Sequence, residues 1–290
     1  MGMKIALACG GTGGHIFPAL AVGKVLKDVH GAEIVVVGRP DSMEERLAAQ
    51  AGVDFCPVPA VPLYRSRWWK NALLPLSAWK SVRRASEVLR REKPQAVFAT
   101  GGYVCLPTGF AAKLAGIPVF VHESNSHPGV ANRLLAKLAT GVFAGSPAGA
   151  AALGGGAVVT GNPVRAMDGR TRQDLRKAMD LTDSDRFLVV IGGSQGARGV
   201  NRILSEEVPV LLDKGWHVLW QTGPAELEAV RARVAAHPRL TIEAFVTDMY
   251  GMFGAADLAL TRAGASTLAE LALHGLPVLL VPFPAATGNH

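Results

Sequence analysis

Short, uninterrupted apolar runs recur along this 290-residue chain, with helix-like segments between them. A strand that is apolar at every position must be buried on both faces, so such runs indicate parallel sheets with helices on both sides. We therefore predict an α/β fold. The predicted strands are Ile5–Ala8, Ile34–Val37, Val97–Ala99, Val119–Val121, Phe187–Ile191, His217–Gln221, Leu258–Leu260 and Val278–Val281.

The second half of the chain repeats the pattern of the first. Lys4–Ala8 leads into the glycine-rich motif GGTGGH, and Phe187–Ile191 leads into GGSQGA. The length also exceeds the size at which one core usually keeps growing. We therefore expect two doubly wound, Rossmann-like domains, 1–162 and 163–290. Their ligands should lie beyond the carboxyl ends of the strands and meet across a cleft.

Composition excludes several classes of protein. Apolar residues make up 49% of the chain and charged residues 18%, and no apolar run approaches the roughly 20 residues of a membrane span. No cationic leader precedes the first strand, so we expect a cytoplasmic protein. Cys9, Cys56 and Cys105 lie far apart near apolar segments, which predicts reduced core thiols. We expect neither a metal site nor a cofactor.

Basic residues concentrate in the first half of the chain. Residues 1–162 hold 17 Lys and Arg against 9 Asp and Glu, a balance of +8, whereas residues 163–290 have a balance of −1. Most of the excess lies in 65–93, together with tryptophans. Tryptophan favours the membrane interface and cations favour anionic lipid, so we predict peripheral membrane contact. The predicted contact residues are Trp68, Trp69, Lys70, Leu73, Trp79 and Lys80.

Two alternatives to membrane contact stay open for this basic segment. One is a core helix that carries a solvated basic face. The second is nucleic-acid binding, which we do not expect because no recognition motif accompanies the charge.

The opening motif, Gly10–His15, directly follows the first predicted strand. Its glycines permit positive φ and close approach of a ligand, and the start of the next helix offers N–H groups to an anion. It is not a dinucleotide fingerprint, because the third glycine of G-x-G-x-x-G would fall on Ile16. His15 is a candidate general base. The alternative is that it only caps or packs the turn.

Two turns in the second half also suit phosphate groups. Gly192–Ala197 would hold a phosphate, with Ser194 adding a hydroxyl, or would be a plain glycine turn. The amides of 265–267 would hold a diphosphate, and Glu270 would accept hydrogen bonds from both hydroxyls of a ribose. The alternative for Glu270 is a solvated side chain. The arginines expected at a leaving diphosphate are Arg165 and Arg262.

Polar residues follow two strands of the first half. TGGY occupies 100–103 and HESNSH occupies 122–127. Since the carboxyl ends of parallel strands meet at one edge, we expect both segments to lie beside the opening motif. Single members of the group would alternatively only satisfy buried backbone groups.

Six motifs occur in order along the chain: GGTGGH at 10–15, TGGY at 100–103, HESN at 122–125, GNPVR at 161–165, GGSQGAR at 192–198 and GxxTxxE at 264–270. Together they resemble the MurG family of bacterial GT-B glycosyltransferases. These enzymes move N-acetylglucosamine (GlcNAc) from UDP-GlcNAc to lipid I and so form lipid II for peptidoglycan. The resemblance implies an inverting, metal-independent hexosyltransferase, peripheral on the cytoplasmic side of the inner membrane. It implies UDP-GlcNAc, lipid I and an anionic membrane surface as partners.

The resemblance assigns the donor to the second domain. It implies that Arg165 and the Val246 backbone lie near uracil and that Glu270 binds the ribose. Asn125 would lie near the sugar. The donor-binding residues are expected to be Asn125, Arg165, Gly193, Ser194, Val246, Arg262, Ala265, Ser266, Thr267 and Glu270.

The resemblance assigns the acceptor to the first domain. His15 is the leading candidate to deprotonate the 4-hydroxyl of the N-acetylmuramic acid (MurNAc) residue, and Glu123 and His122 are the further candidates. Attack from the opposite face would invert the anomeric centre. The residues expected on the acceptor side are Thr12, Gly13, Gly14 and Tyr103.

Two competing hypotheses remain. The chain would be a UDP-GlcNAc 2-epimerase on the same GT-B scaffold, or a non-catalytic fragment that binds nucleotide sugar or membrane. The family continues beyond 282–284 into a paired-glutamine motif, whereas this sequence stops at His290. We therefore expect a C-terminally truncated form.

Overall fold

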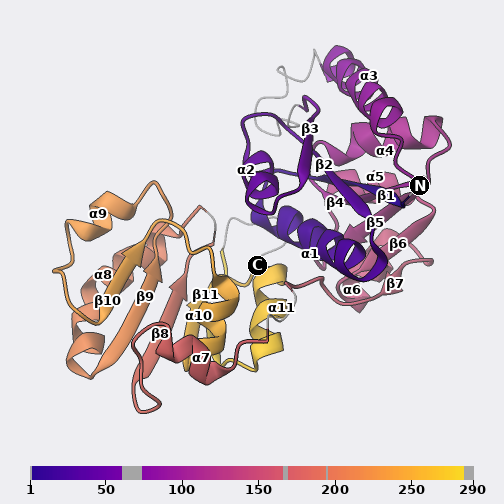
Figure 1. The fold of residues 1–290 in the computed structure, drawn as a ribbon. Helices are drawn as coiled ribbons and strands as arrows, with labels where there is room; N and C mark the ends of the chain where they lie inside the picture. The colour runs from indigo at the N-terminus through magenta and orange to yellow at the C-terminus, as the bar shows by residue number, and fades with distance from the viewer. Residues whose placement is uncertain (1, 61–73, 166–168, 194, 284–290) are drawn as a thin grey trace. The chain divides into compact units, whose positions relative to one another are not determined.

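A computed structural model describes residues 2–60, 74–165, 169–193 and 195–283. The chain divides into two compact units, Met1–Val164 and Arg165–His290. Each unit has its own sheet (Figure 1). The division predicted after residue 162 falls close to this boundary.

The first unit is built on a seven-stranded parallel sheet of order β3-β2-β1-β4-β5-β6-β7. Its strands are β1 (Lys4–Cys9), β2 (Glu33–Gly38), β3 (Asp54–Pro57), β4 (Ala96–Gly101), β5 (Val119–Glu123), β6 (Gly141–Ala144) and β7 (Val158–Val159). Its helices are α1 (Gly13–His30), α2 (Met43–Gln50), α3 (Leu74–Glu92), α4 (Cys105–Leu114), α5 (Val130–Ala136) and α6 (Pro147–Leu153).

Both faces of this sheet are buried, as the continuous apolar runs predict. Ile5 and Leu7 belong to a core cluster with residues of α1 and α2. Ala6 and Ala8, the alternating positions, belong to a second cluster with residues of α3, α4 and α5. Because side chains alternate along a strand, β1 needs apolar residues throughout to serve both clusters.

The second unit has a five-stranded parallel sheet of order β10-β9-β8-β11-β12. Its strands are β8 (Arg186–Ile191), β9 (Trp216–Gln221), β10 (Leu240–Glu243), β11 (Leu258–Thr261) and β12 (Val278–Leu280). Its helices are α7 (Arg172–Lys177), α8 (Arg198–Asp213), α9 (Leu227–Arg231), α10 (Met249–Ala255) and α11 (Ala265–His274). Helices α8 and α9 cover one face, and α7, α10 and α11 cover the other.

The predicted α/β class with parallel sheets is confirmed, and all eight predicted strands are present. Strands β3, β6, β7 and β10 were not predicted. They have at most four residues and lie toward the sides of their sheets, so none carries a long apolar run. β10, for example, alternates between exposed and half-buried residues.

All three cysteines are buried free thiols, as predicted. The Cys105 thiol donates to Ala8 O at 3.0 Å, and burial raises its pKa to about 12. Within the described residues, no helix combines the length and the apolar character that crossing a membrane requires.

Candidate active site

The opening motif and the TGGY segment lie side by side at the carboxyl edge of the first sheet. Gly10 N donates to Gly101 O at 3.1 Å, and Thr100 Oγ1 donates to His15 O at 2.7 Å. Gly102 has φ +97°, and a Cβ there would collide with Gly10 O, so the two segments meet backbone to backbone. The predicted convergence of these motifs is confirmed.

His15 is half-buried in the first turn of α1 with a defined ring orientation. Its Nδ1 lies 3.0 Å from Gly10 O, and the Thr12 hydroxyl lies 3.4 Å away. A carbonyl oxygen only accepts, so Nδ1 carries the proton in this contact and the neutral ring keeps its lone pair on Nε2. The ring rests against Gly101, where a Cβ would stand 2.9 Å from Nε2.

Of the remaining acceptor-side residues, Thr12, Gly13 and Gly14 directly precede His15, and Tyr103 belongs to the TGGY segment. Thr12 is exposed at the N-cap of α1, Gly13 is buried and Gly14 is exposed. Tyr103 is 47% exposed and lies just before α4. All four therefore lie at the carboxyl edge of the sheet.

Glu123 is buried and fully engaged at the end of β5. Its Oε1 accepts from the backbone N and the side-chain Nδ2 of Asn125, each at 2.9 Å. Its Oε2 accepts from Gly129 N at 3.1 Å and from Asn132 Nδ2 at 3.0 Å. With four donors on one buried carboxylate, Glu123 is arranged to hold the HESN loop and Asn125 in place.

Asn132, on α5, is a site residue that was not predicted from the sequence. Its Nδ2 reaches Glu123 Oε2, lies 3.2 Å from His122 O and lies 3.5 Å from Thr100 O. Asn132 thereby connects the TGGY segment to the HESN segment. A polar residue in a short helix, next to Arg133, carries no motif by itself in the sequence.

His122 is buried with its ring directed to the link between the units. Its Nε2 lies 3.0 Å from Gly161 O, so the proton resides on Nε2. Nδ1 then holds the lone pair, and it is buried without a hydrogen-bond partner among the described residues. Burial lowers the pKa of His122, which favours the neutral ring. This geometry suits an anchor for the link rather than a proton acceptor for a ligand.

In the second unit, loops from three strands meet around Gln221. Gln221 ends β9 and is 1% exposed. Its Nε2 donates to Gly193 O at 2.9 Å, and its Oε1 accepts from Val246 N at 2.8 Å. Ser194, the predicted phosphate ligand, lies outside the described residues. Gln221 was not predicted as a site residue, because a glutamine at a strand end carries no motif by itself.

Arg165 and Glu270, predicted to share the nucleoside site, lie together. Arg165 Nε is 3.4 Å from Glu270 Oε1, and Arg165 Nη1 donates to Thr247 O at 3.0 Å. Burial raises the pKa of Glu270, and the Arg165 charge opposes that rise. The carboxylate is thus partly desolvated and lies beside Arg165.

The beginning of α11 carries the predicted diphosphate turn. Gly264 is the N-cap, and Ala265, Ser266 and Thr267 form the first helical turn, half-buried. Backbone N–H groups at a helix start suit an anion. Arg262, expected nearby on the phosphate, instead donates to Val281 O at 3.1 Å and to Pro282 O at 3.0 Å, and it stacks over the ring of Phe283.

Two of the predicted membrane-contact residues, Trp79 and Lys80, lie on α3. Trp68, Trp69, Lys70 and Leu73 lie outside the described residues. On α3, Trp79 is 57% exposed, Leu76 and Lys80 are also exposed, and Arg83 lies over the Trp79 ring. Further residues of α3 belong to the core, so the helix presents an apolar inner face and a basic outer face.

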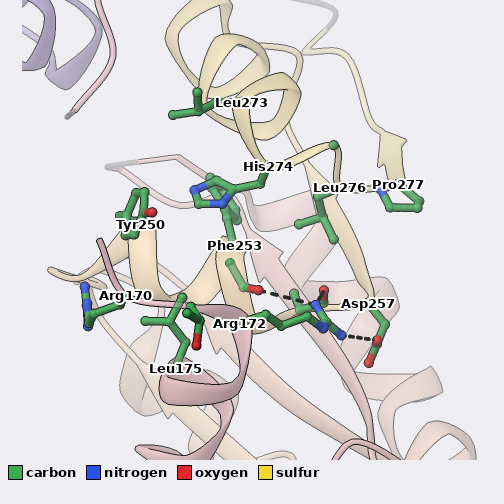
Figure 2. Close-up of a pocket in the computed structure, with 14 residues that line it drawn as sticks. Arg170, Arg172, Leu175, Tyr250, Phe253, Asp257, Leu273, His274, Leu276 and Pro277 are labelled. Carbon is green, nitrogen blue, oxygen red and sulfur yellow. Dashed lines mark hydrogen bonds and ion pairs between the residues drawn. The ribbon is translucent and has the colours of Figure 1, made fainter. Parts of the chain in front are cut away.

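A pocket of about 550 Å³ lies in the second unit at the amino ends of β11 and β12 (Figure 2). Its charged side chains are paired: Arg170 binds both oxygens of Asp248 and Arg172 binds Asp257. It lies at the sheet edge opposite Gln221 and Glu270. We therefore do not assign it to the donor site.

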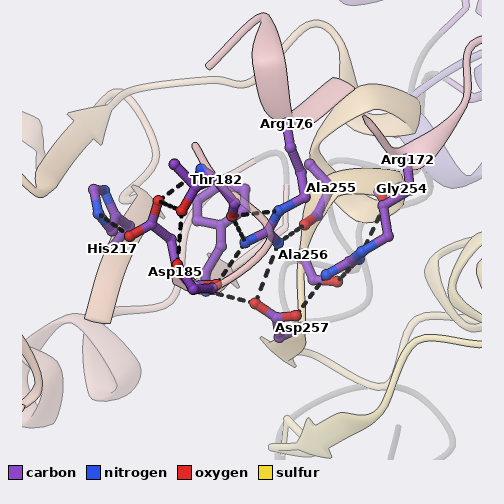
Figure 3. A network of polar contacts seen from close by, with 11 residues as sticks. Arg172, Arg176, Thr182, Asp185, His217, Gly254, Ala255, Ala256 and Asp257 are labelled. Carbon is purple, nitrogen blue, oxygen red and sulfur yellow. Dashed lines mark hydrogen bonds and ion pairs between the residues drawn. The ribbon is translucent and has the colours of Figure 1, made fainter. Parts of the chain in front are cut away.

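The same edge carries a buried arginine network (Figure 3). Arg176 is 1% exposed and donates to Thr182 O at 2.8 Å and to Ala255 O at 2.7 Å. It also pairs with Asp257, which binds Arg172. Since its donors are taken up by carbonyls and a carboxylate, this network serves to join α7 to the end of α10. In the described part of the chain, no group of His, Cys, Asp or Glu is arranged to hold a metal ion.

Two protein-family models match this chain, one in each unit. Residues 5–144 match the model of the glycosyltransferase family 28 N-terminal domain, and residues 187–290 match that of its C-terminal domain. The two parallel sheets and the two loop clusters thus define a two-domain glycosyltransferase of the GT-B type.

Curated relatives narrow the class. The UDP-N-acetylglucosamine--N-acetylmuramyl-(pentapeptide) pyrophosphoryl-undecaprenol N-acetylglucosamine transferase of Moorella thermoacetica is 37% identical over 99% of this chain and 81% of its own. The enzyme of the same name from Parasynechococcus marenigrum is 40% identical over 99% of this chain and 78% of its own. The chain belongs to the MurG family.

Solved structures agree with this placement. The crystal structure of Acinetobacter baumannii MurG has a TM-score of 0.70 and 30% identity, covering 100% of this chain and 81% of its own. A UDP-GlcNAc 2-epimerase from Neisseria meningitidis has a TM-score of 0.66 at 14% identity, covering 97% of this chain and 83% of its own. The second likeness shows a shared fold alone.

Proposed function

We propose that this glycosyltransferase moves GlcNAc from UDP-GlcNAc to the 4-hydroxyl of MurNAc in lipid I, giving lipid II for peptidoglycan. The named activity of the relatives supports this donor and acceptor. The observation that carries the proposal for the site is His15, whose Nδ1 contact to Gly10 O leaves the lone pair of the neutral ring on Nε2.

In the proposed reaction, O4 of MurNAc attacks C1 of GlcNAc from the face opposite the leaving group. The O4–C1 bond forms while the bond from C1 to the diphosphate oxygen breaks, and UDP leaves with that electron pair. His15 Nε2 takes the proton of the 4-hydroxyl, which contributes typically 10²–10⁴-fold to rate. A single displacement inverts the anomeric centre from α to β.

The donor is proposed to lie on the second unit. Glu270 accepts the ribose hydroxyls, Arg165 and Val246 flank the base, and the turns at Gly193 and at 265–267 hold the diphosphate with Ser194. Their contacts support this grouping, because Gln221, Thr247 and Arg165 link these segments. Arg262 would act from the end of β11. We propose that Asn125, held by Glu123, faces the sugar, and that His122 and Glu123 position rather than transfer protons.

A transfer assay tests the proposal. The protein is incubated with radiolabelled UDP-GlcNAc and a lipid I analogue, with a full-length MurG relative as assay control. We expect labelled lipid II. UDP-GlcNAc binding without transfer would favour a non-catalytic fragment, and UDP-ManNAc formation from UDP-GlcNAc alone would favour an epimerase.

We also propose that the protein is peripheral on the cytoplasmic side of the inner membrane and contacts anionic lipid through α3. Exposed Trp79 and Lys80 support this proposal, since tryptophan and cations favour the lipid interface. Trp68, Trp69, Lys70 and Leu73 are the further proposed contacts.

Vesicle sedimentation with anionic and with neutral lipid measures this contact. We expect Lys80→Ala to weaken anionic-vesicle binding about fivefold, which corresponds to about 1 kcal/mol per cation. The variant Ile203→Ala, an exposed apolar position on α8, is the control and should bind as the parent does. Equal binding of the parent to both lipids would contradict the electrostatic part of the proposal.

A further inference from the structure

Gln221 occupies the last paired position shared by three strands. In register it lies between Ile191 of β8 and Glu243 of β10. Beyond this level one further backbone hydrogen bond, from Thr222 N to Glu243 O at 2.9 Å, joins β9 to β10, and the three strands then separate into loops. Where the strand pairing ends, buried polar groups of the loops still need hydrogen-bond partners, and side chains supply some of them.

The Gln221 side chain provides that connection in two directions. Its Nε2 donates to Gly193 O at 2.9 Å, in the loop after β8. Its Oε1 accepts from Val246 N at 2.8 Å, in the loop after β10. Gly193 O also accepts from Gly196 N at 2.9 Å, so the carbonyl that Gln221 holds is itself part of the closing turn of the glycine loop.

The connection continues to the opposite end of the proposed donor site. Thr247, next to Val246, accepts from Arg165 Nη1, and Arg165 Nε lies 3.4 Å from Glu270 Oε1. A chain of short contacts therefore runs from the glycine loop through Gln221 to the carboxylate proposed for the ribose.

We infer that Gln221 is a positioning residue that couples the diphosphate half of the donor site to its nucleoside half. This inference rests on the proposed function. The side-chain amide combines a donor and an acceptor on one neutral, planar group, which suits a position that is 1% exposed and contacts both an N–H and a carbonyl. A glutamate would keep the acceptor for Val246 N but would place an oxygen against Gly193 O.

The coupling should affect the affinity for UDP more than the affinity for uridine. With Gln221 in place, the contacts that order the nucleoside loop also hold the diphosphate loop in its binding position. The ratio of the Kd for uridine to the Kd for UDP measures this advantage. A variant that only lowers the folded fraction weakens both ligands by the same factor and leaves the ratio unchanged.

The experiment measures the Kd values of uridine and UDP by calorimetry for the parent, Gln221→Glu and Gln221→Met. For Gln221→Glu we expect UDP to bind about tenfold more weakly and uridine within about twofold of the parent. For Gln221→Met, which is neutral and similar in length, we expect the ratio to fall about fivefold even though both ligands weaken. The KM for UDP-GlcNAc should rise with little change in kcat.

Arg239→Met is the control, because it removes a partly buried contact, Arg239 Nη2 to Leu212 O, at the opposite edge of the same unit. It should keep the parent ratio. An unchanged ratio in both Gln221 variants would overturn the inference. If the parent bound neither uridine nor UDP, the proposed function would fail instead.

Discussion

His15 and Glu270 are prepared by the fold in different ways. His15 has a fixed orientation, because the carbonyl of Gly10 holds Nδ1–H and the absent side chain of Gly101 leaves room for the ring. Glu270 has an altered proton affinity, because burial raises its pKa against the pull of Arg165. Substitutions that displace the ring therefore test the role of His15, and the pH dependence of donor binding tests the role of Glu270.

We expect His15→Ala to lower kcat by about 10²–10⁴-fold, the usual contribution of a general base. Gly101→Ala leaves residue 15 a histidine but should reproduce part of this loss of kcat. The new Cβ would stand 2.6 Å from His15 Cδ2 and so displace the ring. Gly116→Ala is the control: Gly116 also has positive φ, but a Cβ there meets nothing within 4 Å. Steady-state kinetics measures all three. Equal kcat in Gly101→Ala and Gly116→Ala would show that His15 does not depend on this space.

Glu270 should make donor binding pH-dependent. The ionised carboxylate accepts the ribose hydroxyls, so UDP-GlcNAc affinity should fall as pH drops toward the raised pKa of Glu270. Glu270→Gln should bind about tenfold more weakly at pH 8, and its affinity should not vary with this titration. Binding titrations from pH 8 to pH 5 measure this. Glu206→Gln, an exposed position on α8, should behave as the parent does.

The raised pKa of Glu270 affects stability and donor affinity in opposite directions: as pH rises, donor affinity increases and the free energy of unfolding falls. Since the folded pKa of Glu270 lies above its unfolded pKa, ionisation costs free energy of folding as pH rises through the folded value. Glu270→Gln should therefore raise the free energy of unfolding at pH 8 while it weakens the donor. Urea unfolding checks the sign, and a less stable variant would contradict it.

At the scale of elements, the site in the first unit consists of loops that residues of β5 and α5 hold together. The Glu123 carboxylate, at the end of β5, accepts hydrogen bonds from Asn125, Gly129 and Asn132 and so fixes the HESN loop. Asn132 extends the same contacts to the TGGY segment. The order of this sheet edge therefore depends on one buried carboxylate and one buried amide.

Glu123→Gln separates anchoring from base catalysis. The amide would turn an NH₂ group toward N–H donors, so we expect a loss of about 2–3 kcal/mol in the free energy of unfolding and a lower kcat. The acidic limb of the pH–rate profile should keep its midpoint. Disappearance of that limb with unchanged stability would instead identify Glu123 as the base. Glu92→Gln, which breaks the pairs with Lys4 and Arg91 away from the site, should lose stability but keep kcat.

At the scale of the whole molecule, each unit has two core clusters of its own, one on each face of its sheet. The proposed donor contacts from Arg165 to Glu270 all belong to the second unit. A ligand that binds only a folded unit stabilises that unit by mass action.

We expect UDP at 100 times its Kd to stabilise the second unit by about 2.7 kcal/mol. Hydrogen exchange with mass spectrometry should show slower exchange in β8 and β9 and unchanged exchange in β1 and β4. Glu270→Gln at the same UDP concentration should show less protection. Protection confined to β1 and β4 would mean that our proposal assigns the nucleotide to the wrong unit.

The sequence by itself determined the parallel sheets, the two glycine-rich loops, the placement of TGGY beside His15 and the placement of HESN near TGGY. Each follows from local rules, since a continuous apolar run must be buried and parallel strands end at one edge. Tertiary structure alone decided which polar side chains serve as anchors. Glu123, Asn132 and Gln221 acquire their partners from segments brought together only by folding, and Arg262 turns to the carbonyls of 281 and 282 for the same reason. Hydrogen-bond partners depend on distances in space, and those distances are set by packing rather than by spacing along the chain.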